Sequence, residues 1–412
     1  MAGSTALLQP KTLEKRIFSI DVLRGLAVLG ILIMNIQSYA LPASAYINPT
    51  SYDPSSLVNY DLWVYLLSHI FANGKFLAIF SMLFGAGIIM ISNKAKKEQM
   101  RSGELQSKRL LWLLIIGILH AYLLWYGDIL VAYAICGFFM FMFRSRRAKT
   151  LFRLGILFLV IGSAISLVLG YSVPFWELAE FEQLRADIWL PTAESHAEEI
   201  EFYRSNWERQ MFLRAPKAFE MQTVVFLSDT FWKVSGLMLL GMAFYKKRVF
   251  TAKQSRKYYR KMVIYGIGLG LPLVAIGLIV NFHYDWEFRK SYYYFSQLNY
   301  WGSVLMAIGY IGFIMILVKL NATNWIFTRL SQVGKLALTN YLMQSVICSF
   351  IFYGHGMAMF ADLDRAFLAL IVLAIWLIQI AFSHFWLSFF RFGLFEWVWR
   401  SLTYGKFQPM IR

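Results

Sequence analysis

The sequence alternates long apolar runs with short loops that carry Lys and Arg, and this alternation restricts the fold more than any single motif. Ten apolar runs have the composition of membrane helices: 17–41, 62–92, 110–126, 129–143, 151–171, 223–245, 262–281, 297–318, 336–353 and 366–390. Charged residues make up 15% of the chain and hydrophobic residues 58%, a balance typical of proteins that lie in lipid. The sequence therefore predicts an all-α, polytopic helical membrane protein with about ten transmembrane helices.

The positions of Lys and Arg predict the orientation of the chain. The formal net charge is +17, which in a soluble protein would indicate a nucleic-acid partner. Here the cations lie in short loops between apolar runs, where they mark the cytoplasmic side of the membrane. We therefore expect both termini in the cytoplasm, the segment 41–60 outside because it has no Lys or Arg, and no nucleic-acid partner.

The order of runs and loops divides the chain into four parts. They are a cytoplasmic leader, 1–16, a five-helix membrane half, 17–171, an extracytoplasmic polar region, 172–222, and a second five-helix membrane half with a cytoplasmic tail, 223–412. A cleaved signal peptide is not expected, because the first run is too long and contains Asp21 and Arg24. The acidic region 172–222 is expected to form a cap or amphipathic helices outside.

Three polar residues interrupt the first apolar run: Asp21, Arg24 and Asn35. A charge in hydrocarbon is retained where it has a partner or faces a cavity. On a helix, the side chains of Arg24 and Asn35 lie about 20° apart around the axis and roughly 16 Å apart along it. Asp21 lies one turn before Arg24 on the same side. Two interpretations stay open: a structural ion pair that locks the helix into its bundle, or a functional polar face.

Two histidines near the predicted outer surface are candidate general bases. His120 lies about four residues before the 125–128 turn, and an imidazole there can take a proton from a bound hydroxyl or amine. Asp128 could orient the ring, and the alternative is a buried histidine bonded to a backbone carbonyl. His69, shortly before an expected helix break at Gly74, is either the rival base or a marker of the membrane interface.

Metal and disulfide chemistry is not expected. Cys136 and Cys348 both lie in apolar runs, where thiols are usually core residues. No two of the six histidines have the i, i+3 or i, i+4 spacing of a helical metal site. The sequence also contains no phosphate-binding loop, dinucleotide fingerprint or serine-hydrolase elbow. We therefore predict no metal site and none of the common chemistry of soluble enzymes.

Several motifs resemble those of the YeiB family of bacterial membrane proteins. They are SIDVLRG at 19–25, GKF at 74–76, LFGAG at 83–87, GILH at 117–120, GDIL at 127–130, GKLALTNY at 334–341 and FEWVWR at 395–400. The resemblance covers almost the whole chain except the region 172–222. It implies a multi-pass protein of the bacterial inner membrane, from a family largely uncharacterised and loosely described as involved in transport.

The first run is also distantly similar to that of transmembrane acyltransferases of the heparan-alpha-glucosaminide acetyltransferase type. In the branch that O-acetylates bacterial surface sugars, an Arg is followed after ten residues by a His. Here Arg24 is followed after ten residues by Asn35. In this departure the chain resembles the heparan-type branch, whose working His comes later. The segment from His69 to Gly74 resembles that later region.

The acyltransferase resemblance implies that acyl-CoA enters from the cytoplasm as co-substrate, and that its acyl group reaches a small-molecule acceptor at the outer face. The implied donor-binding residues are Arg24, Asp21 and Lys75, with loop cations in 246–248 and 256–257 attracting the phosphates. The implied catalytic residues are His120, Asp128, Asn35 and His69. His120 or His69 would deprotonate the acceptor, and Asn35 would hydrogen-bond the developing oxyanion.

Two other classes of function stay open. In a transporter or channel for a small anionic or zwitterionic solute, Asp21 and Arg24 would line a path and the break at Gly74 would form a gate. In a structural or sensory protein, the acidic region 172–222 would bind a partner. The sequence leaves open whether the protein forms a homo-oligomer.

Overall fold

A computed structural model of the chain describes residues 17–52, 57–320 and 324–412. The predicted leader 1–16 lies outside these residues. Within them the secondary structure is helical and contains no strand, which confirms the all-α prediction. Apolar helices of this length belong in a bilayer because all their backbone groups are bonded internally. The protein is therefore a multi-pass membrane protein.

The helices differ widely in length. In chain order they are α1 (Phe18–Ala40), α2 (Ala43–Ile47), α3 (Asn59–Phe71), α4 (Lys75–Lys97), α5 (Ser102–Leu123), α6 (Leu130–Phe141), α7 (Ala148–Ser172), α8 (Leu178–Ile188), α9 (Ala193–Arg204), α10 (Trp207–Gln222), α11 (Phe231–Lys246), α12 (Arg256–His283), α13 (Ser296–Leu320), α14 (Asn324–Lys335), α15 (Ala337–Phe352), α16 (Arg365–Phe389) and α17 (Leu394–Tyr404).

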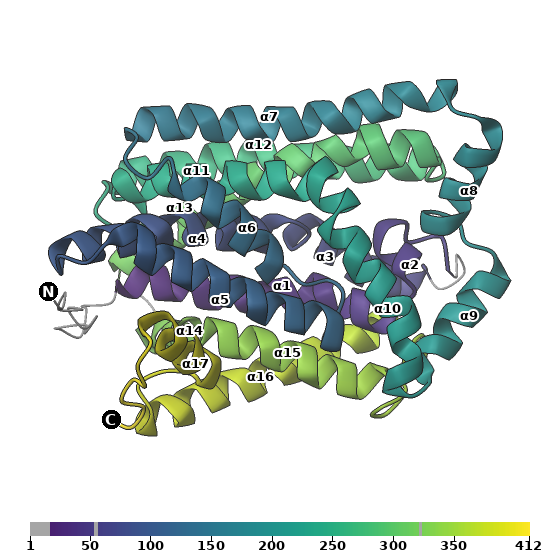
Figure 1. Ribbon diagram of the computed structural model, residues 1–412. Helices are drawn as coiled ribbons and strands as arrows, with labels where there is room; N and C mark the ends of the chain where they lie inside the picture. The colour runs from purple at the N-terminus through teal and green to yellow at the C-terminus, as the bar shows by residue number, and fades with distance from the viewer. Residues whose placement is uncertain (1–16, 53–56, 321–323) are drawn as a thin grey trace, which may run out of the picture.

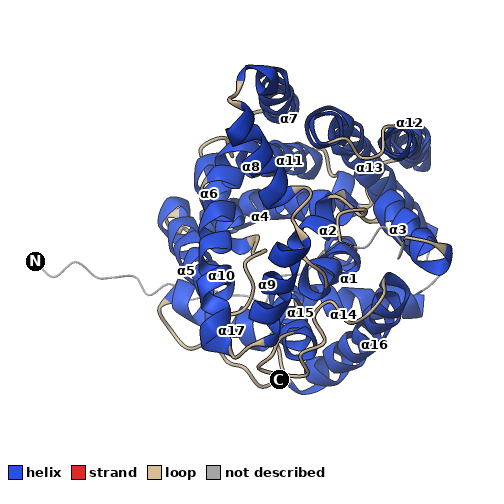
Figure 2. Ribbon diagram, turned by 90° about the vertical axis from the view of Figure 1, so that its right-hand side faces the viewer, coloured by secondary structure: helices blue, strands red, loops and turns tan. Residues whose placement is uncertain are grey.

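Helix α1 lies inside the bundle. It packs against α4 on one side and against α14, α15 and α16 on the other, and Figures 1 and 2 show it enclosed by these helices. In the most apolar stretch of α1, 78% of the residues are buried, whereas only 28% are buried in the corresponding stretches of α7, α12 and α16. A buried helix can keep polar side chains that a lipid-facing helix cannot, which explains why Asp21, Arg24 and Asn35 are tolerated there.

Seven helical segments in the described residues are long and apolar enough to cross a membrane, or eight if α14 and α15, bent by 80°, form one span. Helix α5 is not among them, and α6 has only 12 residues, about 18 Å of helix. The predicted count of ten spans is therefore not confirmed. The break expected within the run 62–92 is confirmed, because α3 and α4 are separated at Gly74, whose φ is +79°.

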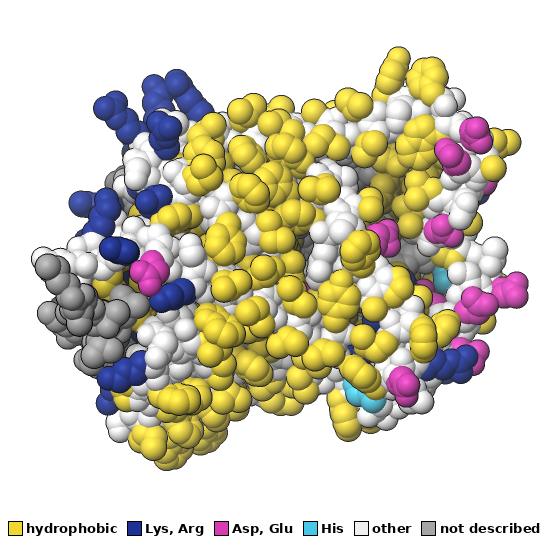
Figure 3. Space-filling model, in the orientation of Figure 1, with side chains coloured by type: hydrophobic (Ala, Val, Ile, Leu, Met, Phe, Trp, Pro, Cys, Tyr) yellow, Lys and Arg dark blue, Asp and Glu magenta, His cyan; other side chains and the backbone are white. Residues whose placement is uncertain are grey.

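Charges separate to the two ends of the bundle (Figure 3). Most Lys and Arg residues lie at one end, called here the basic end, which contains the α4–α5, α6–α7 and α11–α12 connections. The acidic residues of 172–222 lie at the opposite, acidic end, on α8, α9 and α10 (Figure 1). This separation agrees with the predicted topology, but the side of the membrane that each end faces stays a prediction.

Candidate functional site

His120 and Asp128, predicted as a base and its orienting carboxylate, are in direct contact. His120 lies in the last turn of α5, and Asp128 lies in the connection to α6. The distance from His120 Nδ1 to Asp128 Oδ1 is 2.7 Å, and both side chains are 1% exposed. The backbone N–H of Val131 donates to the other carboxylate oxygen, Oδ2, at 2.8 Å. The short α5–α6 connection therefore holds the carboxylate against the ring.

Two further hydroxyl groups extend this pair into a chain of four buried side chains. His120 Nε2 lies 2.7 Å from Ser345 Oγ of α15, and the Tyr39 hydroxyl of α1 donates to the same oxygen at 2.6 Å. Sequence reasoning missed both residues, because Ser345 and Tyr39 lie in apolar runs where single hydroxyls are common. Their partners are hundreds of residues away in the chain, so no local spacing could reveal them.

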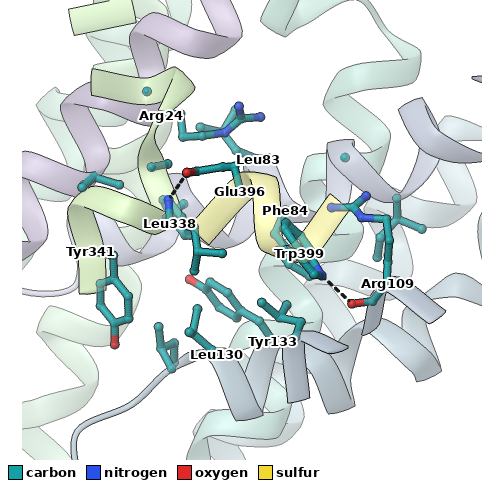
Figure 4. A pocket seen from close by; sticks show the side chains of 18 of the residues that line it. Arg24, Leu83, Phe84, Arg109, Leu130, Tyr133, Leu338, Tyr341, Glu396 and Trp399 are labelled. Carbon is teal, nitrogen blue, oxygen red and sulfur yellow. Dashed lines mark hydrogen bonds between the residues drawn. The ribbon is translucent and has the colours of Figure 1, made fainter. Parts of the chain in front are cut away.

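A partly open cavity of about 200 Å³ lies beside this chain (Figure 4). Apolar side chains form most of its wall, among them Val28, Ile31, Phe80, Leu83, Phe84, Leu113 and Leu130. Tyr341 also lines the cavity, and its ring centroid is 5.2 Å from that of His120. Because Tyr341 contacts both, its ring lies between the cavity and the imidazole.

Cationic residues line the same cavity. Arg24, Arg109 and Lys335 contribute to its wall, and the Arg109 guanidinium lies 4.3 Å from the ring centroid of Trp399. Arg24 Nη1 also pairs with Asp21 Oδ1 at 3.0 Å, with 29% of the Arg24 side chain exposed. The two interpretations of the first helix are thus compatible, because Arg24 is at once an ion-pair partner and a cavity residue.

Asn35 continues the face of α1 that lines the cavity. Arg24, Val28 and Ile31 contribute to the wall, and Asn35 is four residues beyond Ile31 and four before Tyr39, which places it on the same side of the helix. The side chain is half-buried. It makes no hydrogen bond within the described part of the chain, so its amide group can still bind a ligand.

Glu396 of α17 also lines the cavity and was not predicted as a site residue. Its carboxylate accepts from the backbone N–H groups of Leu338 and Thr339, at 2.7 and 3.2 Å, and from the Thr339 hydroxyl at 2.5 Å. These are the first free N–H groups of α15, so Glu396 caps that helix. Burial raises the pKa of Glu396. The motifs at 334–341 and 395–400 therefore contact each other at the start of α15.

His69 and Lys75 contact each other but belong to a different cluster. Lys75 is fully buried and its Nζ donates to the carbonyl of His69 and to Asn299 Oδ1 of α13, both at 2.8 Å. His69 Nδ1 lies 3.2 Å from Asn73 Nδ2. The structure thus brings neither residue to the cavity that Arg24 and Tyr341 line, and their contacts support the break between α3 and α4.

A second cavity of about 650 Å³ lies at the basic end, between the end of α4 and the α6–α7 and α11–α12 loops. Five cationic residues line it: Lys96, Arg144, Lys246, Arg248 and Lys253. Among the described residues that line it, none is an Asp or Glu. Of the loop cations predicted to attract phosphate, Lys246 and Arg248 contribute to this cavity, whereas Lys247 and the cations in 256–257 do not. Among the described residues, no group of three His, Cys, Asp or Glu side chains could hold a metal ion.

Comparisons with known proteins place the chain in one family. Residues 244–406 match the family described as "Protein of unknown function (DUF418)". The uncharacterized protein YeiB of Escherichia coli is 30% identical over 401 residues, which cover 96% of this chain and 98% of that protein. The uncharacterized protein YxaH of Bacillus subtilis is 29% identical over 419 residues, 98% of each chain. With this similarity over nearly its full length, the chain belongs to the YeiB family.

Proposed function

We propose that the protein is a membrane-bound acyltransferase that moves an acyl group from acyl-CoA to a hydroxyl or amine of a small-molecule acceptor. The observation that carries this proposal is the contact of His120 with Asp128 at one ring nitrogen and with a hydroxyl group at the other, each at 2.7 Å. Histidine acts as a general base toward an oxygen nucleophile when a carboxylate is hydrogen-bonded to its Nδ1 and a hydroxyl group to its Nε2.

Asp128 sets the protonation of the ring in this proposal. An ionised carboxylate can only accept hydrogen bonds, so Nδ1 carries the ring proton and Nε2 has a free lone pair. When Nε2 takes a proton, Asp128 stabilises the imidazolium that forms. Because both side chains are shielded from water, this stabilisation is stronger than it would be at a surface.

The two cavities offer complementary places for an acyl-CoA donor. Its phosphates would lie at the basic end, where the described lining of the larger cavity carries five cations and no carboxylate. Its acyl group would lie in the smaller cavity, where Arg24 and Arg109 adjoin an apolar wall that extends to Tyr341. Asn35, whose amide makes no hydrogen bond in the described chain, would donate to the oxyanion of the tetrahedral intermediate.

The test uses purified protein in liposomes and follows the release of thiol from acetyl-CoA and longer acyl-CoAs, with a panel of hydroxyl- and amine-bearing sugars as acceptors. We expect wild type to release thiol and His120→Ala to be slower by about 100-fold or more, because general-base catalysis contributes on that order. His384→Ala is the matched control, since His384 lies at the basic end, where its ring contacts Phe385 and its Nδ1 lies 3.4 Å from Gln332 Nε2.

The control and wild type should have equal rates. Thiol release by His120→Ala at the wild-type rate would remove His120 from the mechanism. If wild type releases no thiol from any acyl-CoA, the acyltransferase proposal is wrong. Uptake of small anionic solutes, compared between wild type and Arg24→Ala, would then test the transport alternative.

A further inference from the structure

We propose that Ser345 is a nucleophile activated by the Asp128–His120 pair, and that it carries the acyl group as an ester between donor and acceptor. This inference rests on the proposed function and adds to it a covalent intermediate on a named side chain. It starts from the hydrogen bonds around Ser345 Oγ, which differ from the backbone-directed hydrogen bonds of Ser81 and Ser92.

The hydroxyl proton of Ser345 is directed at the imidazole. Serines inside helices usually donate to the carbonyl four residues earlier, as Ser81 and Ser92 do here at 2.8 and 2.9 Å. For Ser345 the corresponding distance, to the Tyr341 carbonyl, is 3.5 Å, whereas His120 Nε2 is at 2.7 Å. The Tyr39 hydroxyl donates to the oxygen. Because Asp128 accepts the proton on Nδ1 and leaves Nε2 with a free lone pair, Ser345 donates its single proton to Nε2.

Asp128, His120 and Ser345 thus have the connectivity of a catalytic triad: carboxylate to Nδ1, Nε2 to hydroxyl. The three residues come from α5, the α5–α6 connection and α15, so only the folded bundle assembles them. His120 is 2% exposed and Ser345 1%. An ester formed on Ser345 is therefore shielded from water, which favours transfer to an acceptor over hydrolysis.

The donor would approach from the cavity side. Tyr341 is one turn before Ser345 on the same face of α15, and it lines the cavity while its ring contacts that of His120. An acyl chain in the cavity thus lies one helical turn from the Ser345 hydroxyl. Rotation of the Tyr341 ring away from His120 would open a path from the cavity to the Ser345 hydroxyl.

The two half-reactions balance. In the first, Ser345 Oγ bonds to the thioester carbonyl carbon and the carbon–sulfur bond breaks. The Ser345 proton moves to His120 Nε2 and then to the leaving sulfur, which departs as free CoA thiol. In the second, the acceptor hydroxyl gives its proton to Nε2, and its oxygen bonds to the acyl carbon. The bond from that carbon to Ser345 Oγ breaks, and Ser345 recovers its proton from His120.

The experiment treats the purified full chain in detergent with an alkyl fluorophosphonate, which forms an oxygen–phosphorus bond with activated serines and releases fluoride. Peptide mass spectrometry then locates the modification. We expect the label on Ser345 of wild type, none at that position in Ser345→Ala, and labelling slower by about 100-fold in His120→Ala. Ser349→Ala is the matched control, because Ser349 lies one turn further along α15 and donates to the Val346 carbonyl.

The wild-type peptide map decides the matter even if a variant does not fold. An unmodified Ser345 in wild type, or equal labelling of Ser345 in well-folded His120→Ala, overturns the proposal. Acyl transfer by Ser345→Ala at the wild-type rate also overturns it, but leaves the acyltransferase function and the role of His120 intact. Labelled Ser345 without turnover of any acyl-CoA supports the activated nucleophile and rejects the proposed donor.

Discussion

At the scale of single residues, two glycines decide where Arg24 lies. A Cβ atom on Gly334 would be 1.9 Å from the carbonyl oxygen of Asp21, and one on Gly25 would be 2.0 Å from that of Leu330. These distances mean that the backbones of α1 and α14 touch, as membrane helices do where small residues meet. The contact brings the first turns of α1, which carry the Asp21–Arg24 pair, against the end of α14 beside the cavity.

We predict that Gly334→Ala destabilises the protein, because the new methyl group has to push two backbones apart. Overpacking of this kind costs about 1–3 kcal/mol. The control is Gly268→Ala on α12, where an added Cβ meets nothing within 4 Å and alanine favours the helix. Melting of the detergent-solubilised protein, followed by size-exclusion chromatography, should show a lower midpoint for Gly334→Ala only. Equal midpoints for the two variants would contradict the packing argument.

At the scale of helices, the carboxylate of Glu396 fixes the start of α15 next to the 80° bend from α14. This cap determines where α15 begins, and therefore where Tyr341 and Ser345 lie along it. Helix α17 lies outside the candidate membrane spans. A short amphipathic helix at the basic end thus positions residues deep in the bundle.

The raised pKa of Glu396 predicts a pH effect with a definite sign. Burial favours the protonated carboxyl, so the folded state binds a proton more tightly than the unfolded state, where the pKa is near 4.5. Between the ordinary and the raised pKa the folded state holds more protons, and stability is lost as the pH rises through that range. Glu396→Gln keeps an acceptor for the N–H groups and does not titrate.

The measurement is the melting midpoint of wild type and Glu396→Gln from pH 4.5 upward. The midpoint of wild type should fall relative to that of Glu396→Gln as the pH rises. The other titrating groups are the same in both proteins, so their effects cancel in this comparison. Glu396→Ala removes the cap and should cost about 1 kcal/mol or more at every pH. If the midpoints of wild type and Glu396→Gln differ by the same amount at every pH, Glu396 does not change its proton affinity on folding.

At the scale of the whole molecule, the sequence predicted what depends on local spacing and missed what depends on distant contacts. The i, i+3 pair of Asp21 and Arg24 follows from helix geometry. The orienting role of Asp128 was a hypothesis, because the sequence does not give the turn geometry that places Asp128 against His120. Ser345 and Glu396 could not be found, because their partners come from other helices. The count of ten spans was not confirmed, because apolar length alone does not reveal a short helix or a bent pair.

The acidic end supplies a further prediction. His196 of α9 is buried, and its Nε2 lies 3.0 Å from Ser44 Oγ of α2, which links the outer helices to the bundle. Burial lowers the pKa of His196 below 6.5, while Glu199 partly opposes the shift. The folded state therefore binds fewer protons than the unfolded state below pH 6.5. This contribution to stability is lost as the pH falls from 6.5 through the lowered pKa.

Limited proteolysis of the α9–α10 connection at pH 7.5 and pH 5 tests this effect. Cleavage in wild type should be faster at the lower pH, and His196→Asn should remove most of the difference. His283→Asn, at the exposed end of α12, should behave as wild type. The same pH dependence in His196→Asn would assign the effect to another group.

The interior position of α1 also determines when its surface can be covered during synthesis. The helix ends at Ala40 and its partner α14 begins at Asn324, 284 residues later (324 − 40). At roughly 10 residues per second the ribosome needs about half a minute to make that stretch. Arg365, which donates to Gln37 Oε1 at 2.7 Å in the bundle, is made later still, because it follows Asn324 by 41 residues (365 − 324). The nascent first helix must therefore be held by the insertion machinery or the early helices until the last quarter of the chain arrives.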